Sequence, residues 1–144
     1  MVNDTHGHLV GDKALRAIAG ALSEQLRSYD LAGRFGGEEF AILLPQTRET
    51  QALRIAERLR THVAGLTIPV GEDAATGPCV TLTVSVGVAA LDRIGPELTD
   101  LLAAADAALY LAKQAGRNQT RLATGGIPAP LAQAIPAARP APSV

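Results

Sequence analysis

Apolar residues recur at helical spacing soon after the start of the chain. The opening residues are polar and turn-forming, and from residue 12 to residue 28 an apolar side chain then follows every three or four positions. This spacing lines one face of an α-helix, so the segment predicts a helix. Asp12 sits where an acidic residue caps or complements the first turn. The predicted buried positions are Leu15, Ile18, Ala19, Leu22 and Leu26.

Two further segments have the same periodicity. One covers residues 48–64 and is followed by Gly65, and the other covers residues 97–115 and is followed by Gly116. Glycine directly after a periodic segment is a typical helix end, so both segments predict helices. The predicted buried positions are Ala52, Ala56, Leu59 and Val63 in the first segment, and Leu98, Leu101, Leu102, Ala105, Leu109 and Ala112 in the second.

Strand patterns lie between these helices. Apolar residues 31–35 and 40–44 flank a Gly-Gly-Glu-Glu segment, which predicts a β-hairpin. Residues 80–88 alternate strictly, which is the pattern of a strand with two distinct faces. Short strands are expected near 119–123 and before the loop at 69–78. This order predicts an α+β fold, with an antiparallel-rich sheet and helices packed on it.

The tip of the predicted hairpin carries two glycines, Gly36 and Gly37, and two carboxylates, Glu38 and Glu39. Glycine supplies the positive φ that a tight turn needs. It also removes the side chains that would keep a bulky anion away from the backbone. Both interpretations fit the same residues, and a solvated turn without function is the alternative to a functional site.

The composition is that of one globular domain. The chain has 144 residues, of which 47% are hydrophobic and 19% charged, and this is enough for one core. A net charge of −1 gives no basic field for a nucleic-acid polymer. The chain shows no signal-like start and no apolar run of membrane-spanning length, so we expect a cytoplasmic location without membrane contact. The single cysteine, Cys79, is interpreted as a small residue before a strand.

The composition changes near the end of the chain. Residues 124–144 are mainly alanine, proline, glycine and leucine, and they offer little for a core to bury. We therefore expect one domain over residues 1–123, followed by a disordered tail over residues 124–144.

Four motifs together resemble the GGDEF family, the diguanylate cyclases that join two GTP molecules into cyclic di-GMP. The signature loop occurs in its GGEEF form at residues 36–40. The pattern N-D-x-x-G-H-x-x-G-D matches residues 3–12, T-V-S-x-G-V-A matches 83–89, and A-D-x-A-L-Y-x-A-K-x-x-G-R-N matches 105–118. The resemblance covers residues 2–123 and implies a ferredoxin-like, nucleotidyl-cyclase-like GGDEF fold.

The resemblance implies roles for the GGEEF loop. Gly36 and Gly37 would let the backbone approach the phosphates of GTP, since a Cβ there would collide with them. Glu38 would be a catalytic residue that activates the 3′-hydroxyl. It would also bind Mg²⁺ (or Mn²⁺), because the charge of a triphosphate must be neutralised by a hard cation. Glu39 would point to the other face if the strand begins there, and would be either a further metal ligand or support for the loop.

Four other residues are implied to bind the substrate. Asn3 and Asp12 would read the guanine edge, because an amide and a carboxylate together match its donors and acceptors. Outside the family context, Asp12 is a helix N-cap. Lys113 and Arg117 would contact the phosphates. Outside that context, they are cations that complement the C-terminus of a helix.

A separate inhibitory site for cyclic di-GMP is also implied. Arg27 and Asp30 form an R-x-x-D motif at the family's usual distance before the loop. Arg58 falls where the family places another arginine that binds product. An arginine fork suits both the edge of guanine and a phosphate. The alternative is a surface pair that stabilises a helix end.

The start of the chain departs from the family pattern. The family's first helix, and the first strand with its metal-binding aspartate, have no counterpart before Asn3. The resemblance therefore predicts a GGDEF domain truncated at its N-terminus, with impaired activity because Glu38 lacks a second carboxylate.

The resemblance also implies partners. Each domain of the family holds one GTP, so catalysis would need a homodimer, and a regulatory domain is expected upstream in a full-length protein. The alternative function is a non-catalytic module that senses cyclic di-GMP or GTP, and a purely structural fragment is a third interpretation.

Overall fold

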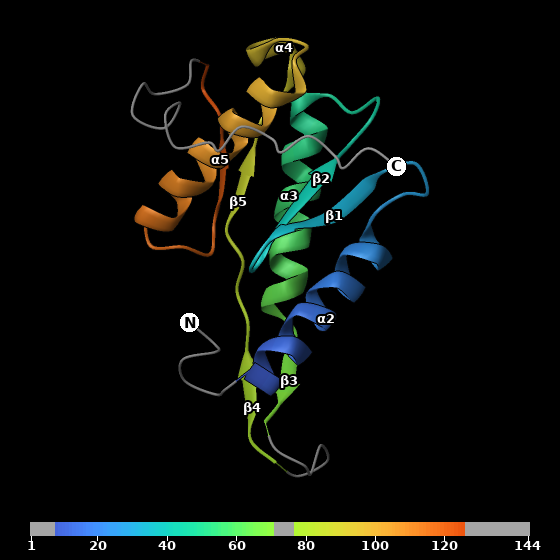
Figure 1. The fold of residues 1–144 in the computed structure, drawn as a ribbon, viewed down its shortest axis with the longest axis vertical. Helices are drawn as coiled ribbons and strands as arrows, with labels where there is room; N and C mark the ends of the chain where they lie inside the picture. Colours follow the sequence, from blue (N-terminus) through green and yellow to red (C-terminus); the bar gives the residue numbers. More distant parts are fainter. Residues whose placement is uncertain (1–7, 71–76, 126–144) are drawn as a thin grey trace, which may run out of the picture.

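The structure is a computed structural model that describes residues 8–70 and 77–125 (Figure 1). All three predicted helices and the hairpin are present, and the mixed helix and strand fold is confirmed. The elements in chain order are α2 (His8–Gln25), β1 (Leu31–Gly36), β2 (Glu39–Leu43), α3 (Glu49–Ala64), β3 (Thr67–Pro69), β4 (Cys79–Thr81), β5 (Val86–Val88), α4 (Leu91–Ile94), α5 (Leu98–Gln114) and β6 (Thr120–Leu122). The predicted tail lies outside the described residues except for its first two positions.

Helix α2 begins four residues earlier than the apolar spacing predicts. Because its first residue is His8, Asp12 lies inside the helix, and the expected capping of the first turn by this side chain is wrong. The buried face is also rotated, since Ala19 is exposed. This difference arises because α2 packs against both α3 and β3, which together select the face that is covered. The buried hydrophobic residues of α2 are Val10, Ala14, Ala21 and Leu22.

The hairpin forms as predicted, with β1 and β2 antiparallel. Its register runs from the pair Leu31–Leu43 to the pair Gly36–Glu39, with a β-bulge between Arg34 and Gly36. Alternate residues of β2 turn towards the helices. The inner side chains Phe40, Ile42 and Leu44 pack against Leu22 of α2 and against Ile55 and Leu59 of α3.

The described strands form three two-stranded sheets instead of one. β3 and β4 are antiparallel, and β5 and β6 are parallel. The continuous strand predicted over residues 80–88 is therefore wrong, because β4 pairs with β3 while β5 pairs with β6, and residues 82–85 join no ladder. Within the described residues, β2 pairs only with β1, and β5 pairs only with β6, so each of these strands has one edge without a neighbouring strand.

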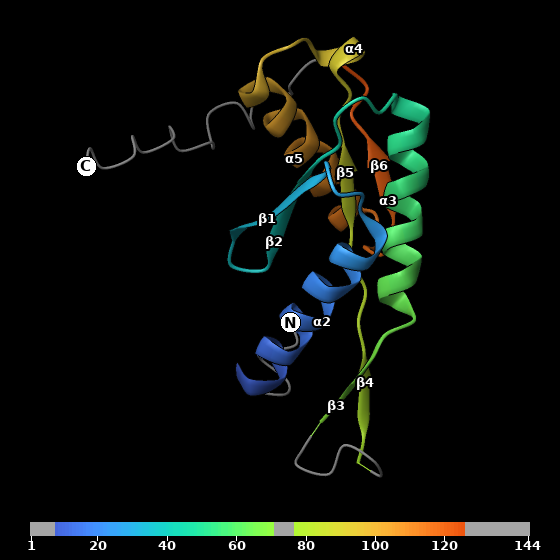
Figure 2. The ribbon, with the colours of Figure 1, turned by 90° about the vertical axis from the view of Figure 1, so that its right-hand side faces the viewer.

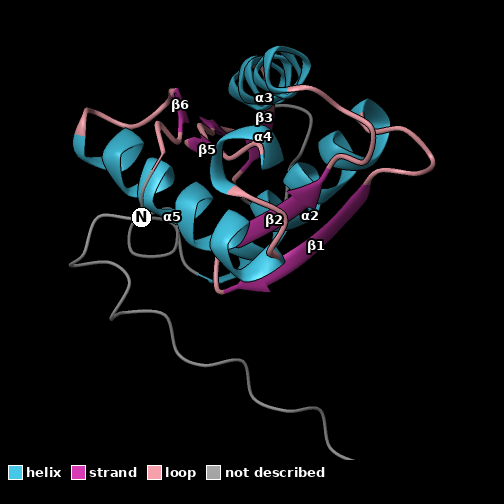
Figure 3. Ribbon diagram, turned by 90° about the horizontal axis from the view of Figure 1, so that it is seen from above, coloured by secondary structure: helices cyan, strands magenta, loops and turns pink. Residues whose placement is uncertain are grey.

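The β5–β6 pair lies between two helices. Figure 2 and Figure 3 both show α3 on one face of this pair and α5 on the other. α3 thus packs against the hairpin and against β5–β6, and it joins these two sheets, whereas β3 packs against α2. No helix within residues 8–70 and 77–125 is long and apolar enough to span a membrane.

Polar side chains tie α3 to the segments that follow it. Arg60 donates to the Glu57 carboxylate and, at 2.6 Å, to Oδ1 of Asn118. Hydrogen bonds from Arg60 and from the hydroxyl of Thr120 lower the pKa of Glu57. These hydrogen bonds therefore hold the loop after α5, at Asn118, and the start of β6, at Thr120, against one turn of α3.

Alanines form the contact face of α5. The buried positions of this helix are all alanine, whereas Leu98, which the apolar spacing places inside, is 55% exposed. The predicted buried stripe is therefore wrong in part. The reason is that β5 lies directly against the helix backbone: a Cβ at Gly87 would be 2.0 Å from the carbonyl oxygen of Ala105 and 2.5 Å from the amide nitrogen of Leu109. The alanines on the buried face of α5, together with the glycine on β5, allow this close approach.

Replacing Gly87 by alanine tests this contact. We expect Gly87→Ala to lower the free energy of unfolding by about 3 kcal/mol, because the added methyl group meets helix backbone that cannot move aside. The measurement is the denaturant midpoint by circular dichroism. The control is Gly20→Ala, where the added methyl group meets nothing within 4 Å on α2. An unchanged midpoint for Gly87→Ala would contradict the packing described here.

Candidate active site

The turn at the tip of the hairpin contains Gly37 and Glu38, between β1 and β2. Neither Gly36 nor Gly37 has a positive φ, so the expectation that these glycines supply a left-handed turn is wrong. The irregular register between Arg34 and Gly36 accompanies the reversal of the chain. A Cβ at either glycine would meet nothing within 4 Å. Neither a positive φ nor close internal packing therefore requires glycine at these two positions.

Arg34 holds this turn from β1, a role that the sequence patterns did not indicate. Its Nε and Nη2 atoms donate to the carbonyl oxygen of Gly37, at 2.9 Å and 2.5 Å. The sequence signal that could have revealed this contact is an arginine three positions before the carbonyl group of a hairpin turn. These two hydrogen bonds hold the backbone of the turn at Gly37 against β1, and no ligand is needed for this contact.

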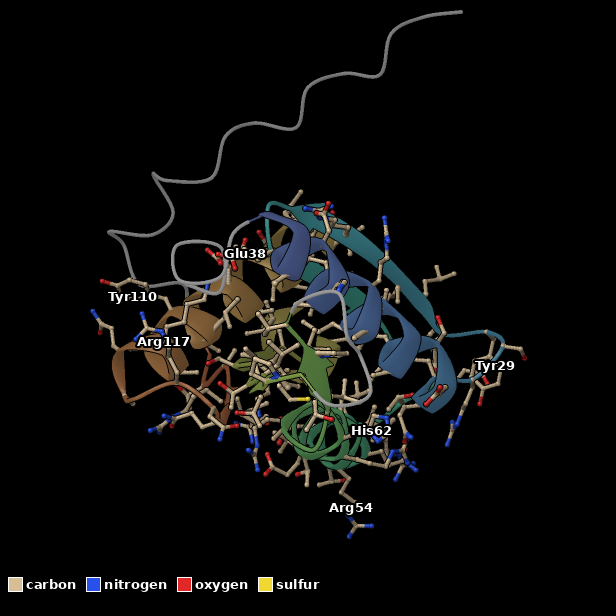
Figure 4. All side chains as sticks on the ribbon, turned by 90° about the horizontal axis from the view of Figure 1, so that it is seen from below. Tyr29, Glu38, Arg54, His62, Tyr110 and Arg117 are labelled. Carbon is tan, nitrogen blue, oxygen red and sulfur yellow. The ribbon has the colours of Figure 1, made fainter. Side chains whose placement is uncertain are left out.

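The two carboxylates of the GGEEF loop have different surroundings. Glu38 lies in the turn, is exposed, and has no hydrogen bond or ion pair with the part of the chain that the structure describes. Figure 4 shows its side chain at the outside of the molecule. Glu39 is the first residue of β2, one position before the predicted apolar run, and its Oε1 atom accepts a hydrogen bond from Nζ of Lys113 at 2.8 Å.

Lys113 comes from the last turn of α5 and reaches the loop across 74 positions of sequence. The fold therefore brings it to the turn, where the family resemblance requires a cation. Arg117 follows the helix end, at a φ of 62°, and is exposed. In Figure 4, Arg117 and Tyr110 lie on the same side of the molecule as Glu38.

Asp12 is exposed on α2, and Asn3 lies outside the described residues. A hollow of about 380 Å³ lies between α2 and the hairpin. Its walls combine apolar side chains with two cations, Arg16 of α2 and Arg34 of β1. The remaining lining residues are Leu15, Ala19, Leu22, Ser23, Ala32, Gly33 and Phe40. The open hollow and its cations suit a ligand that is partly apolar and partly anionic.

The residues of the predicted inhibitory site meet where α2 leads into β1. The backbone N–H of Arg27 donates to Oδ2 of Asp30 at 2.8 Å, and Oδ1 of Asp30 is buried with no hydrogen-bond partner. Nη2 of Arg58, from α3, donates to the carbonyl oxygen of Gln25 at 2.9 Å. The structure thus brings Arg58 to the helix end that precedes Arg27.

The guanidinium of Arg27 also contacts Tyr29, which the sequence patterns did not single out. Nη1 of Arg27 donates to the Tyr29 hydroxyl at 2.8 Å, and the guanidinium carbon lies 5.8 Å from the ring centroid. In Figure 4, Tyr29 lies at the opposite side of the molecule from Glu38. The residues around Arg27 therefore form a location separate from the GGEEF loop.

The described residues offer a limited set of metal ligands. No group of three histidine, cysteine, aspartate or glutamate side chains gathers among residues 8–70 and 77–125. Glu38 fits a metal ligand because its carboxylate is exposed and has no partner among the residues that the structure describes, whereas Glu39 is paired with Lys113. One carboxylate together with phosphate oxygens and waters matches the way Mg²⁺ is commonly bound.

Comparison with known proteins identifies the class. The family described as "Diguanylate cyclase, GGDEF domain" matches residues 1–119. This chain belongs to the GGDEF family. The match covers the hairpin, α5 and the segment around Arg27, so every element of the site described above lies within it or at its edge.

Individual relatives agree with this assignment. The chain is 43% identical over 119 residues to the response regulator PleD of Caulobacter vibrioides, which covers 81% of this chain and 25% of PleD. It therefore spans about a quarter of the length of that curated relative. Among solved structures, the GGDEF domain of TpbB (YfiN) from Pseudomonas aeruginosa is 36% identical with a TM-score of 0.75, covering 85% of this chain and 69% of that one. The GGDEF domain of DgcB from Caulobacter crescentus, solved with cyclic di-GMP, is 32% identical with a TM-score of 0.74, covering 84% and 69%.

Proposed function

We propose that this chain is a diguanylate cyclase domain that condenses two GTP molecules into cyclic di-GMP and two pyrophosphates. In each half of the reaction the 3′-oxygen of one GTP bonds to the α-phosphorus of the other, and the bond from that phosphorus to the pyrophosphate leaving group breaks. The observation that carries the proposal is the meeting of open glycine backbone, the unpaired Glu38 carboxylate and Lys113 at one turn.

In this proposal the hairpin binds the triphosphate. Gly36 and Gly37 let the phosphates approach the backbone, and Lys113 and Arg117 supply positive charge near them. Glu38 accepts the proton of the 3′-hydroxyl, because its exposed carboxylate can approach a ligand at the turn. Asp12 and Asn3 are proposed to read guanine. For Asp12 the N-cap alternative is removed by its position inside α2.

The proposal includes Mg²⁺ or Mn²⁺, which would neutralise the charge of the triphosphate. Glu38 would hold the metal together with phosphate oxygens. Since the described residues provide a single suitable carboxylate at the turn, we propose that the 144-residue chain has low turnover by itself. A homodimer would bring two GTP molecules together, and a regulatory domain fits the greater length of PleD. We also propose that the domain covers residues 1–123 and that it acts in the cytoplasm.

A nucleotide-binding module without turnover is the second candidate function. It is favoured by the small number of metal ligands and by the convergence of Arg27, Asp30 and Arg58 away from the turn. The DgcB domain, which was solved with cyclic di-GMP, supports binding of this dinucleotide by a related fold. Formation of cyclic di-GMP from GTP separates the two functions.

Replacing Glu38 tests the catalytic proposal. We expect Glu38→Gln to lower cyclic di-GMP formation about 100-fold or more, because it removes the proton acceptor. It should also abolish the increase that Mg²⁺ causes in the affinity for a GTP analogue with an uncleavable α,β-methylene bridge. The measurements are chromatography of radiolabelled product and calorimetry. Glu24→Gln, an exposed glutamate on α2 that faces His62, is the control. Full activity in Glu38→Gln would refute this role.

A methyl group at the turn tests the access of phosphates to the backbone. We expect Gly37→Ala to leave the thermal midpoint unchanged, since the new Cβ meets no protein atom within 4 Å. It should weaken binding of the same GTP analogue about tenfold, because the methyl group occupies the space of the phosphates. Calorimetry and thermal unfolding are the measurements, with Gly20→Ala as the control. Equal affinity for the Gly37→Ala variant and the unaltered chain would show that the glycines serve another purpose.

We further propose that cyclic di-GMP binds at Arg27, Asp30 and Arg58. Oδ1 of Asp30 has no hydrogen-bond partner and is buried, so it would accept from the N–H groups of guanine once the connection between α2 and β1 shifts to expose it. The two guanidinium groups would donate to the edge of guanine or to a phosphate. Binding so far from Glu38 would regulate the turn without occupying it.

Two arginines on the same helix provide the test of this site. We expect Arg58→Ala to weaken cyclic di-GMP binding about tenfold or more, as the loss of a charged hydrogen bond does. Arg54→Ala should have no effect, because Arg54 is exposed on α3 and projects away from the protein in Figure 4. Calorimetry with cyclic di-GMP measures both variants. Equal weakening by the two substitutions would indicate a general loss of positive charge instead of a site.

A further inference from the structure

We propose that Glu39 is a positioning residue for Lys113 and is not a ligand of the metal. This inference rests on the proposed function, because it concerns how the domain presents Lys113 to the triphosphate. Its basis is the hydrogen-bonded ion pair of 2.8 Å between Nζ of Lys113 and Oε1 of Glu39, which joins the end of α5 to the start of β2.

The strand geometry separates Glu39 from Glu38. Within β2, Phe40 and Ile42 face α2 and α3. Because side chains alternate along a strand, Glu39 projects to the opposite face, where the end of α5 supplies Lys113. Glu38 lies one residue earlier, in the turn itself. The two carboxylates therefore have different neighbours, and no group of three possible metal ligands includes them within the described residues.

The ion pair with Glu39 restricts the Lys113 side chain and leaves its ammonium group accessible to phosphate oxygens. The side chains of Lys113 and Glu39 are 43% and 47% exposed, so their ion pair contributes little to the stability of the fold. A flexible lysine side chain without a partner samples many rotamers, and the carboxylate restricts these. An ammonium group has three donors, so a hydrogen bond to Glu39 leaves two for phosphate oxygens.

The packing of α5 fixes the position from which Lys113 contacts Glu39. The packing of Ala105 and Leu109 on Gly87 fixes the helix against β5, and the bond from Arg60 to Asn118 fixes the loop that follows the helix. Arg34 independently fixes the carbonyl group of Gly37. Lys113 and the turn are thus each held by the fold, and Glu39 joins them directly.

Three competing roles for Glu39 predict different results. A metal ligand would change the Mg²⁺ concentration that nucleotide binding requires. A carboxylate that competes with the phosphates for Lys113 would weaken binding, so its removal would tighten it. A purely structural ion pair would change thermal stability and leave affinity unaltered. A positioning residue lowers affinity through Lys113 alone.

The test is calorimetry of the 144-residue chain with the α,β-methylene analogue of GTP. The variants are Glu39→Gln, Lys113→Met and the double substitution. We expect Glu39→Gln to weaken binding about fivefold. Lys113→Met should weaken it at least as much, and the double variant should bind like Lys113→Met, because Glu39 acts through Lys113. The Mg²⁺ midpoint of binding and the thermal midpoint of unfolding should stay unchanged in Glu39→Gln.

Controls separate this inference from the proposed function. Glu24→Gln makes the same change of charge away from the turn and should leave binding unaltered. If the unaltered chain does not bind the analogue, the proposed function and this inference both fail. If Glu38→Gln weakens binding and Glu39→Gln does not, the inference alone fails. Tighter binding by Glu39→Gln, a shifted Mg²⁺ midpoint, or additive losses in the double variant would each overturn it as well.

Discussion

Close contact between α5 and β5 is the constraint on which the site depends. Gly87 lies against the carbonyl group of Ala105, and the buried face of the helix is composed of alanine. Only a residue without a Cβ fits such an approach. The position of α5 in turn places Lys113 beside Glu39, so the geometry of the candidate active site follows from a packing contact in the core.

Two helices compensate for the division of the strands, because β3 packs on α2 and the other pairs pack on α3. The described strands form three separate pairs, and none of these pairs would be stable alone in water. α3 packs against the inner face of β2 and against β5–β6, so it supplies the common surface that one continuous sheet would otherwise give. The hairpin tip extends beyond this support, and Arg34 provides its local order.

Charge distinguishes the two ends of the hairpin. At the tip, Glu38 has no partner within residues 8–70 and 77–125, and the neighbouring Glu39 carboxylate is paired with Lys113. At the other end, Arg27 and Arg58 gather around the α2–β1 connection, where Asp30 keeps one buried oxygen unpaired. The fold therefore separates the proposed chemistry from the proposed regulation by the length of the hairpin.

The sequence by itself determined the helices, the hairpin and the family, because apolar periodicity and motif spacing are local properties. The tertiary structure decided which faces are buried, where the 80–88 segment divides, and that Lys113 pairs with Glu39. It also showed that Gly36 and Gly37 do not need a positive φ. These features depend on contacts between residues far apart in sequence, such as Gly87 with Ala105, and no local pattern of side chains specifies how closely two backbones approach.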